Sequence, residues 1–185
     1  MRKIFQKIEQ IELFPQAVKW FFLAALVGIL AGCASAFFLV SLNWITHWRD
    51  SHLWIIALLP VGGLVIGLVY HYWGKKVEAG HNLLLDEVHD PKSVVLVRMA
   101  PLVLVSTLAT HFFGGSAGRE GTAVQMGSAL ADQLSIPFRL KPADRRILLM
   151  AGMSAGFASV FGTPLAGAIF GLEVLAIGRL RYDAI

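Results

Sequence analysis

The sequence predicts an all-α membrane protein with broken and re-entrant helices. Three observations support this class: the composition, two long apolar runs near the N-terminus, and shorter apolar segments interrupted by Gly and Pro beyond them. Of the 185 residues, 56% are hydrophobic and 15% are charged, whereas soluble domains are about 45–50% apolar and about 25% charged. The mean hydropathy is +0.66. This composition is that of an integral membrane protein.

The net charge of +4 does not point to nucleic acid, because no basic run carries interleaved aromatic residues. In a membrane protein, basic residues more often mark cytoplasmic loops. The lone Cys33 cannot form an internal disulfide. The six histidines show no tight ligand spacing, so we expect packing or interfacial roles for them, and neither a metal site nor a cofactor.

Residues 1–16 mix polar and apolar side chains and lack the pattern of a signal peptide. They predict an amphipathic segment at the cytoplasmic interface, with a mobile tail as the alternative for the first few residues. Residues 17–185 form the predicted transmembrane domain.

Two segments are long enough to cross a bilayer, Ala17–Trp48 and Leu53–Trp73. The loop between them, RDSH, holds one Arg, whereas the N-terminus and Gly74-Lys75-Lys76 hold several basic residues. The positive-inside rule then places the N-terminus in the cytoplasm. We expect a multi-pass integral membrane protein, in the inner (plasma) membrane of a bacterium.

The segments after Lys76 are shorter. Ala79–Pro91 is too short to cross and Ser93–Phe113 is long enough, and three further helices follow at Thr122–Leu134, Ile147–Phe161 and Pro164–Gly178. Broken helices at membrane depth are tolerated only where protein buries them or water lines them, which is how transporters build ion sites. The alternative is a bundle of ordinary helices.

Four pairs of glycines have the Gly-x-x-x-Gly spacing that lets helices approach closely in lipid. They are Gly28 with Gly32, Gly63 with Gly67, Gly114 with Gly118, and Gly167 with Gly171. A chain with 18 glycines produces such pairs by chance, so this pattern is a weak signal of packing.

The stretch GGSAGREGT, Gly114–Thr122, is a sharper signal. Small residues lead into a predicted helix start, where unpartnered N–H groups and the helix dipole favour an anion. Glu120 at this point is itself an anion and can compete with the ligand, so its protonation couples to anion occupancy. We expect Arg119 to be structural, pairing with a carboxylate or capping carbonyl groups.

A second helix start, Gly80-His81-Asn82, can direct its amides and the Asn82 side chain at the same anion. We expect the acidic residues that follow, Asp86, Glu87 and Asp90, to face the cytoplasmic surface. The basic stretch Arg139–Arg146 is predicted to be a solvated loop, with electrostatic collection of anions as the alternative.

One enzymatic function stays open as an alternative interpretation of the sequence. Residues 114–118 match G-x-S-x-G, so an intramembrane serine hydrolase would use Ser116 or Ser154 as nucleophile and His111, His89 or His81 as base. The preceding segment is a membrane helix and not the strand that this motif requires. No βαβ unit surrounds the glycines, which argues against a dinucleotide site.

Two longer stretches, GGSAGREGTAVQMGSALADQL and LLMAGMSAGFASVFGTPLAGAIFGLEVL, resemble the G-R-E-G-P helix start and the paired helices that follow it in the CLC family of chloride channels and anion/proton antiporters. The resemblance covers the chain from Ala17. It implies a homodimer in which each subunit has two inverted repeats, and this chain matches only the first repeat.

The resemblance makes Glu120 the gating and proton-coupling residue. It implies an anion-binding role for seven positions: Gly80, His81, Asn82, Gly118, Arg119, Gly121 and Thr122. The family's usual serine is absent at Gly80-His81-Asn82, and Thr122 replaces the proline of G-R-E-G-P. Both departures resemble the fluoride/proton antiporter branch. Many chloride antiporters of the family use a glutamate to deliver protons from the inside, and this position falls on Val174 here. The resemblance therefore puts proton delivery by this glutamate in doubt.

The expected function is therefore transport of a small anion across the lipid bilayer. Fluoride/proton antiport is the first expectation, and a chloride channel or chloride/proton antiporter is the alternative.

Overall fold

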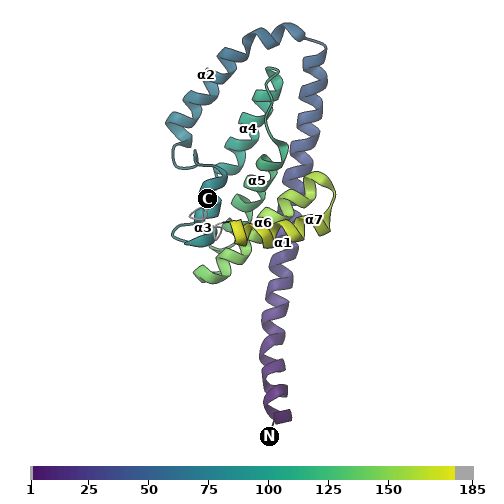
Figure 1. Cartoon of the computed structure of the whole chain (residues 1–185), viewed down its shortest axis with the longest axis vertical. Coiled ribbons are helices and arrows are strands. Elements are labelled where there is room, and N and C mark those ends of the chain that lie inside the picture. Colours follow the sequence, from purple (N-terminus) through teal and green to yellow (C-terminus); the bar gives the residue numbers. More distant parts are fainter. Residues whose placement is uncertain (1, 178–185) are drawn as a thin grey trace, which may run out of the picture.

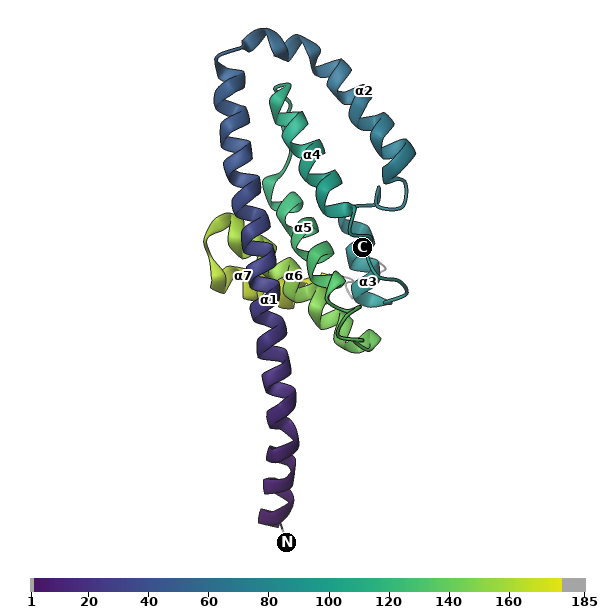
Figure 2. The ribbon, with the colours of Figure 1, turned by 180° about the vertical axis from the view of Figure 1, so that it is seen from behind.

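The computed structural model describes residues 2–177, and the regular elements in this part of the chain are all helices, with no strand. Figure 1 shows one long helix beside a bundle of shorter ones, and Figure 2 shows the same arrangement from behind. The predicted all-α class is confirmed.

Helix α1 (Arg2–Asp50) contains the first predicted span and continues through Pro15 without a break. No interruption of the helix therefore marks the expected boundary after residue 16. At 1.5 Å per residue, its 49 residues extend about 74 Å, more than the thickness of a bilayer with its headgroups, about 40–45 Å. The N-terminal part of α1 projects beyond the rest of the molecule (Figure 1).

The second predicted span is confirmed as a helical segment, but its helix type changes along its length. It begins as the 3₁₀-helix η1 (Leu53–Leu58), continues as α2 (Leu59–Val69) and ends in the π-helical turn η2 (Tyr70–Gly74). By length and composition, Pro15–Asp50 and Leu53–Gly74 are the two segments in the described part of the chain that can cross a membrane.

Five shorter helices follow. They are α3 (His81–His89), α4 (Met99–Phe112), α5 (Arg119–Gln133), α6 (Pro142–Phe161) and α7 (Pro164–Ile177). The end of α7 predicted at Gly178 lies outside the described residues.

Two predicted helix starts were wrong. Helix α4 begins at Met99 and not at Ser93, because backbone N–H groups at Ser93 and Val95 bond to the carboxylates of Glu87 and Asp132 instead of continuing a helix. Helix α6 begins at Pro142 and not at Ile147, since proline suits the first helical turn, where a missing N–H costs little.

Helix α5 lies at the centre and packs most extensively on α6. The two backbones nearly touch: a Cβ added to Gly152 of α6 would lie 2.7 Å from the carbonyl oxygen of Gly127 in α5, and a Cβ added to Gly127 would lie 3.1 Å from the Gly156 Cα. This crossing depends on Gly152-x-x-x-Gly156, a pair that the four predicted ones do not include.

The predicted glycine pairs differ in their packing. Gly167 and Gly171 of α7 pack against Ser154 of α6, whereas Gly28, Gly32, Gly63 and Gly67 have no atom within 4 Å of an added Cβ. The core around α5 is a cluster of buried apolar side chains that includes Phe38, Leu84, Met99, Val124 and Leu149.

Candidate functional site

Helix α5 starts at Arg119, within GGSAGREGT and three residues before the start predicted at Thr122. Gly118 is its N-cap, with extended backbone angles (φ −68°, ψ 124°), and Glu120 lies in the first turn. A Cβ built on Gly118 would lie 3.5 Å from Oε2 of Glu120, so the carboxylate bends back over the start of its own helix. Glu120 is half-buried and forms no ion pair within the described residues.

The backbone amides beside this carboxylate are the first N–H groups of α5, which have no acceptor within the helix. In the described part of the chain, no bond joins the amides of Gly118 to Gly121 to another element. A Cβ added to Gly121 would meet no atom within 4 Å. Donors, open space and a competing carboxylate therefore occur together.

The loop before α5 is held in place by backbone carbonyl contacts. The His111 Nε2 lies 3.0 Å from the Ala117 carbonyl oxygen, and Arg49 of α1 donates to the His111 carbonyl oxygen at 3.1 Å. Gly114 has φ 82°, which favours glycine. These contacts fix where α5 begins.

A cavity of about 460 Å³ opens beside this loop, and its polar lining includes Arg49, His111, Ser116 and Arg119. The Arg119 side chain is exposed. The expected pairing of Arg119 with a carboxylate is absent among the described residues, so its guanidinium is available to solutes in this cavity.

Thr122 is buried and joins α5 to α4. Its hydroxyl lies 3.0 Å from the Gly118 carbonyl oxygen and 2.7 Å from the Thr107 hydroxyl. Its single proton thus serves contacts inside the protein. The structure gives Thr122 a positioning role, and its contact with an anion stays a prediction.

The second predicted site segment also approaches α5. Gly80 precedes α3 with φ 56° and ψ −117°, and a Cβ added to it would lie 3.4 Å from Oε1 of Gln125. Gln125 is four residues after Gly121, so both occupy one face of α5, about one turn apart. The Gly80 turn and the α5 start therefore border the same side of α5.

His81 and Asn82 contribute differently at this turn. His81 is half-buried, and desolvation lowers the pKa of its imidazole, which favours the neutral ring. Asn82 is exposed, and its backbone N–H is already bonded to the Ala79 carbonyl oxygen at 3.1 Å. Asn82 can therefore bind an anion only through its side-chain amide.

The sequence predictions missed a buried charge network at the other end of α5. Arg145, in the first turn of α6, donates to Asp132 at 2.7 and 2.9 Å and lies 3.0 Å from Oε2 of Glu87. It also donates to the Ser93 carbonyl oxygen. Asp132 is fully buried, with 0% of its surface exposed.

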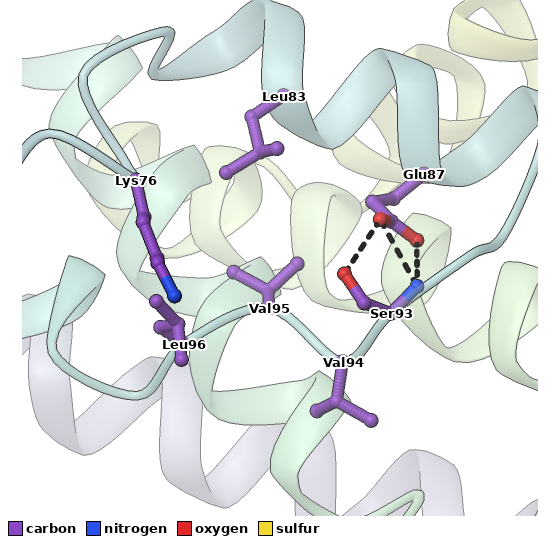
Figure 3. Close-up of a pocket in the computed structure, with 7 residues that line it drawn as sticks. All are labelled: Lys76, Leu83, Glu87, Ser93, Val94, Val95 and Leu96. Carbon is purple, nitrogen blue, oxygen red and sulfur yellow. Dashed lines mark hydrogen bonds between the residues drawn. The ribbon is translucent and has the colours of Figure 1, made fainter.

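Glu87 and Asp132 also hold the segment before α4. Glu87 accepts hydrogen bonds from the Lys92 and Ser93 amides at 2.9 and 3.2 Å and from the Ser93 hydroxyl at 3.2 Å, as Figure 3 shows for Ser93 beside a cavity of about 410 Å³. Asp132 accepts from the Val95 amide at 2.7 Å. Three helices and this segment therefore meet at Arg145.

Two expectations about charges were consequently wrong. Arg145 does not lie in a solvated loop, and Glu87 does not face the surface, although Asp86 and Asp90 are exposed. Burial alone would lower the pKa of Arg145, but hydrogen bonds and charges from Asp132 and Glu87 outweigh burial and raise it. The spacing of Asp132 and Arg145 gave no signal, because the two meet through a turn between helices.

The hydrolase alternative finds no support in this geometry. His111 is engaged with the Ala117 carbonyl oxygen, and Nδ1 of His89 lies 2.8 Å from the Leu85 carbonyl oxygen. Neither Ser116 nor Ser154 is hydrogen-bonded to a histidine among the described residues.

These features define a class: a helical membrane protein in which a glycine-rich helix start, a carboxylate and a second helix start border one side of a central helix. Residues 62–185 match the family model described as voltage gated chloride channel. The chain belongs to this family, which confirms the resemblance.

Two curated relatives agree with this assignment. The chain is 64% identical over 181 residues to a chloride/fluoride channel protein of Pseudomonas syringae pv. tomato, covering 98% of this chain and 40% of the relative. It is 32% identical over 178 residues to the H(+)/Cl(-) exchange transporter ClcA of Vibrio vulnificus, covering 89% and 38%.

A crystal structure of a CLC-type fluoride/proton antiporter superposes with a TM-score of 0.80 at 40% sequence identity, covering 85% of this chain and 40% of that chain. The match confirms the predicted CLC-type fold with broken helices. The chain thus spans about two fifths of the length of these relatives.

Proposed function

We propose that the protein exchanges fluoride for protons across the membrane, with Glu120 as the gating and proton-coupling residue. The observation that supports this most directly is the position of the Glu120 carboxylate, folded back beside Gly118 and the unpartnered first-turn amides of α5. A carboxylate in that position occupies the place of an anionic ligand.

The exchange follows from competition for these amides. When Glu120 is ionised, its negative carboxylate is stabilised by the positive N-terminal end of the α5 dipole. Protonation removes the charge, so the side chain leaves and a free anion replaces it. Because charge in a desolvated site is costly, the proton and the anion occupy the site in linked steps.

The preference for fluoride rests on the two sequence departures at Gly80-His81-Asn82 and Thr122. Fluoride is small and strongly hydrated, so compact donors such as bare amides must replace its water. The chloride/fluoride channel protein and the fluoride/proton antiporter among the relatives support this choice. The chloride alternative is supported by the similarity to ClcA.

Efflux from liposomes tests the choice of ion. The full-length protein that contains this sequence is reconstituted in vesicles loaded with fluoride or chloride, and ion-selective electrodes follow release after a proton gradient is imposed. Fluoride efflux is expected to exceed chloride efflux. Equal or faster chloride efflux would assign the protein to the chloride alternative.

The assembly is also part of the proposal. We infer a homodimer, with the N-terminus in the cytoplasm and the anion-binding set Gly80, His81, Asn82, Gly118, Arg119, Gly121 and Thr122 completed by a second repeat. The 185 residues alone are expected to give no flux above protein-free liposomes, because one repeat leaves the ion path open on one side.

A further inference from the structure

An apolar groove runs between α1 and α6, away from the start of α5. Its lining comes from Trp20 and Ala24 of α1 and from Ile147, Leu148 and Ala151 of α6, and its volume is about 340 Å³. Two neighbouring residues of α1 expose large apolar side chains, with Phe21 80% and Phe22 53% exposed. This part of α1 is therefore suited to a hydrocarbon environment.

Positive charges from three elements gather at the same end of the groove. The Lys19 Nζ lies 5.7 Å from the centre of the Trp20 ring and 3.3 Å from Asp144. Lys141, the N-cap of α6, lies three residues before Asp144 and so on the same face of α6 as Leu148 and Ala151.

Arg139 comes from the turn before α6. Phe138 packs edge-to-face on Phe22, with ring centres 6.2 Å apart, and this contact holds the turn at the level of Trp20. Arg139 has φ 46°, and the turn is closed by a bond from the Leu140 amide to the Ser135 carbonyl oxygen. The turn therefore presents the exposed Arg139 next to α1.

The charge balance here is positive. Asp144 offsets one of the three cations Lys19, Arg139 and Lys141. Basic clefts between apolar helices bind the head groups of anionic lipids, and each basic residue near such a surface adds about fivefold to the affinity.

We propose that this groove binds an anionic phospholipid, with an acyl chain between Trp20 and Ala151 and the headgroup phosphate among Lys19, Arg139 and Lys141. A free phosphate would contact the cations but leave the apolar groove empty. A lipid with an uncharged headgroup would fill the groove but leave the cations without a partner. An anionic phospholipid satisfies both the groove and the cations.

Native mass spectrometry of the full-length protein in detergent tests this proposal, with phosphatidylglycerol and phosphatidylcholine of identical acyl chains as probes. The protein is expected to retain phosphatidylglycerol in preference. Ala24→Trp fills the groove and should abolish the retained adduct. The double variant Arg139→Gln, Lys141→Gln should weaken it about 25-fold, two steps of about fivefold.

Matched controls separate the site from general effects. Val61→Trp adds the same bulk at an exposed position of α2, and Lys75→Gln with Arg98→Gln removes two exposed charges elsewhere; both should retain the lipid as the unmodified protein does. Thermal unfolding verifies that each variant is folded.

Three results would overturn the proposal. They are equal retention of the two lipids, an unchanged adduct in both groove variants, and cryo-EM density in a phosphatidylglycerol nanodisc that places polypeptide in the groove. Inorganic phosphate is included as a third probe, and its competition with the lipid at equal concentration would also reject the acyl-chain contact.

Discussion

Glu120 is the second residue of α5, and its carboxylate lies beside Gly118. Glu120→Gln keeps the size of the side chain and removes its titration. Proton flux driven by a fluoride gradient in liposomes of the full-length protein should then fall to the level of protein-free vesicles, whether or not fluoride still moves.

The exposed Glu78 provides the control, since Glu78→Gln removes a carboxylate outside the proposed site and should leave proton flux unchanged. Proton flux at the unmodified rate in Glu120→Gln would show that another group couples the two ions.

Gly80 holds the backbone at φ 56° and ψ −117°, a conformation that residues with a Cβ rarely adopt. Gly80→Ala should reduce the free energy of unfolding by about 1–3 kcal/mol, and the new methyl group would press on Gln125. Thermal unfolding in detergent measures the loss.

Gly28→Ala is the matched substitution, because Gly28 is helical and faces open space. It should keep or raise stability, by up to about 1 kcal/mol. Equal losses of stability in the two variants would show that a side chain at position 80 causes no additional backbone strain.

The sequence predicted these single positions well where chemistry is local. A run of small residues before Arg119 and Glu120 reveals a helix start, and Gly118 was found at the N-cap. The roles of Thr122 and Arg119 were harder to predict, since a hydroxyl proton or a guanidinium takes its partner from whatever element packs beside it.

At the scale of elements, the junction of α3, α5 and α6 depends on Arg145. Arg145→Met would leave Asp132 and Glu87 buried with their charge uncompensated. Removing one partner of a buried ion pair costs about 3–5 kcal/mol. A large loss in thermal stability is expected, and Lys75→Met, at an exposed position, should cause little change.

A double variant refines this test. Asp132→Asn keeps an acceptor for the Val95 amide and removes the charge, so adding it to Arg145→Met should recover part of the lost stability. If the two losses simply add, the junction is not held by charge.

Helix starts were the elements that the sequence predicted least well. The apolar pattern of Ser93–Phe113 suggested one crossing, but the Ser93 and Val95 amides and the Ser93 carbonyl group bond to charged side chains of α3, α5 and α6. Such bonds join residues far apart in the chain, so the hydropathy of one segment cannot predict them.

At the scale of the whole molecule, the two long spans and the all-α class followed from composition and hydropathy alone. The crossing of α5 and α6 did not, because Gly152 and Gly156 have the same spacing as glycines that face open space, such as Gly28 and Gly32. The sequence did predict that the two helix starts could direct their amides at one anion, but the approach of Gly80 to Gln125, which places both starts on one side of α5, required the folded structure.

The proposed orientation has its own test. Ser51 and Lys75 lie at opposite ends of the segment Leu53–Gly74. In a Cys33→Ala background, Ser51→Cys should react with a membrane-impermeant maleimide in intact cells, and Lys75→Cys should react only after lysis. The reverse labelling pattern would show that the N-terminus lies outside the cell. Labelling of both cysteines before lysis would show that this segment does not cross the membrane.

The charge junction has a consequence for how the chain is made. Glu87 and Asp132 leave the ribosome before Arg145 does, so for a time the nascent chain carries two carboxylates whose cation has not yet been synthesised. The end of α3 and the segment before α4 cannot take up their final positions until the first turn of α6 emerges. The packing of this region is therefore expected to be completed only after Arg145, the last of the three charges to be synthesised, has been added.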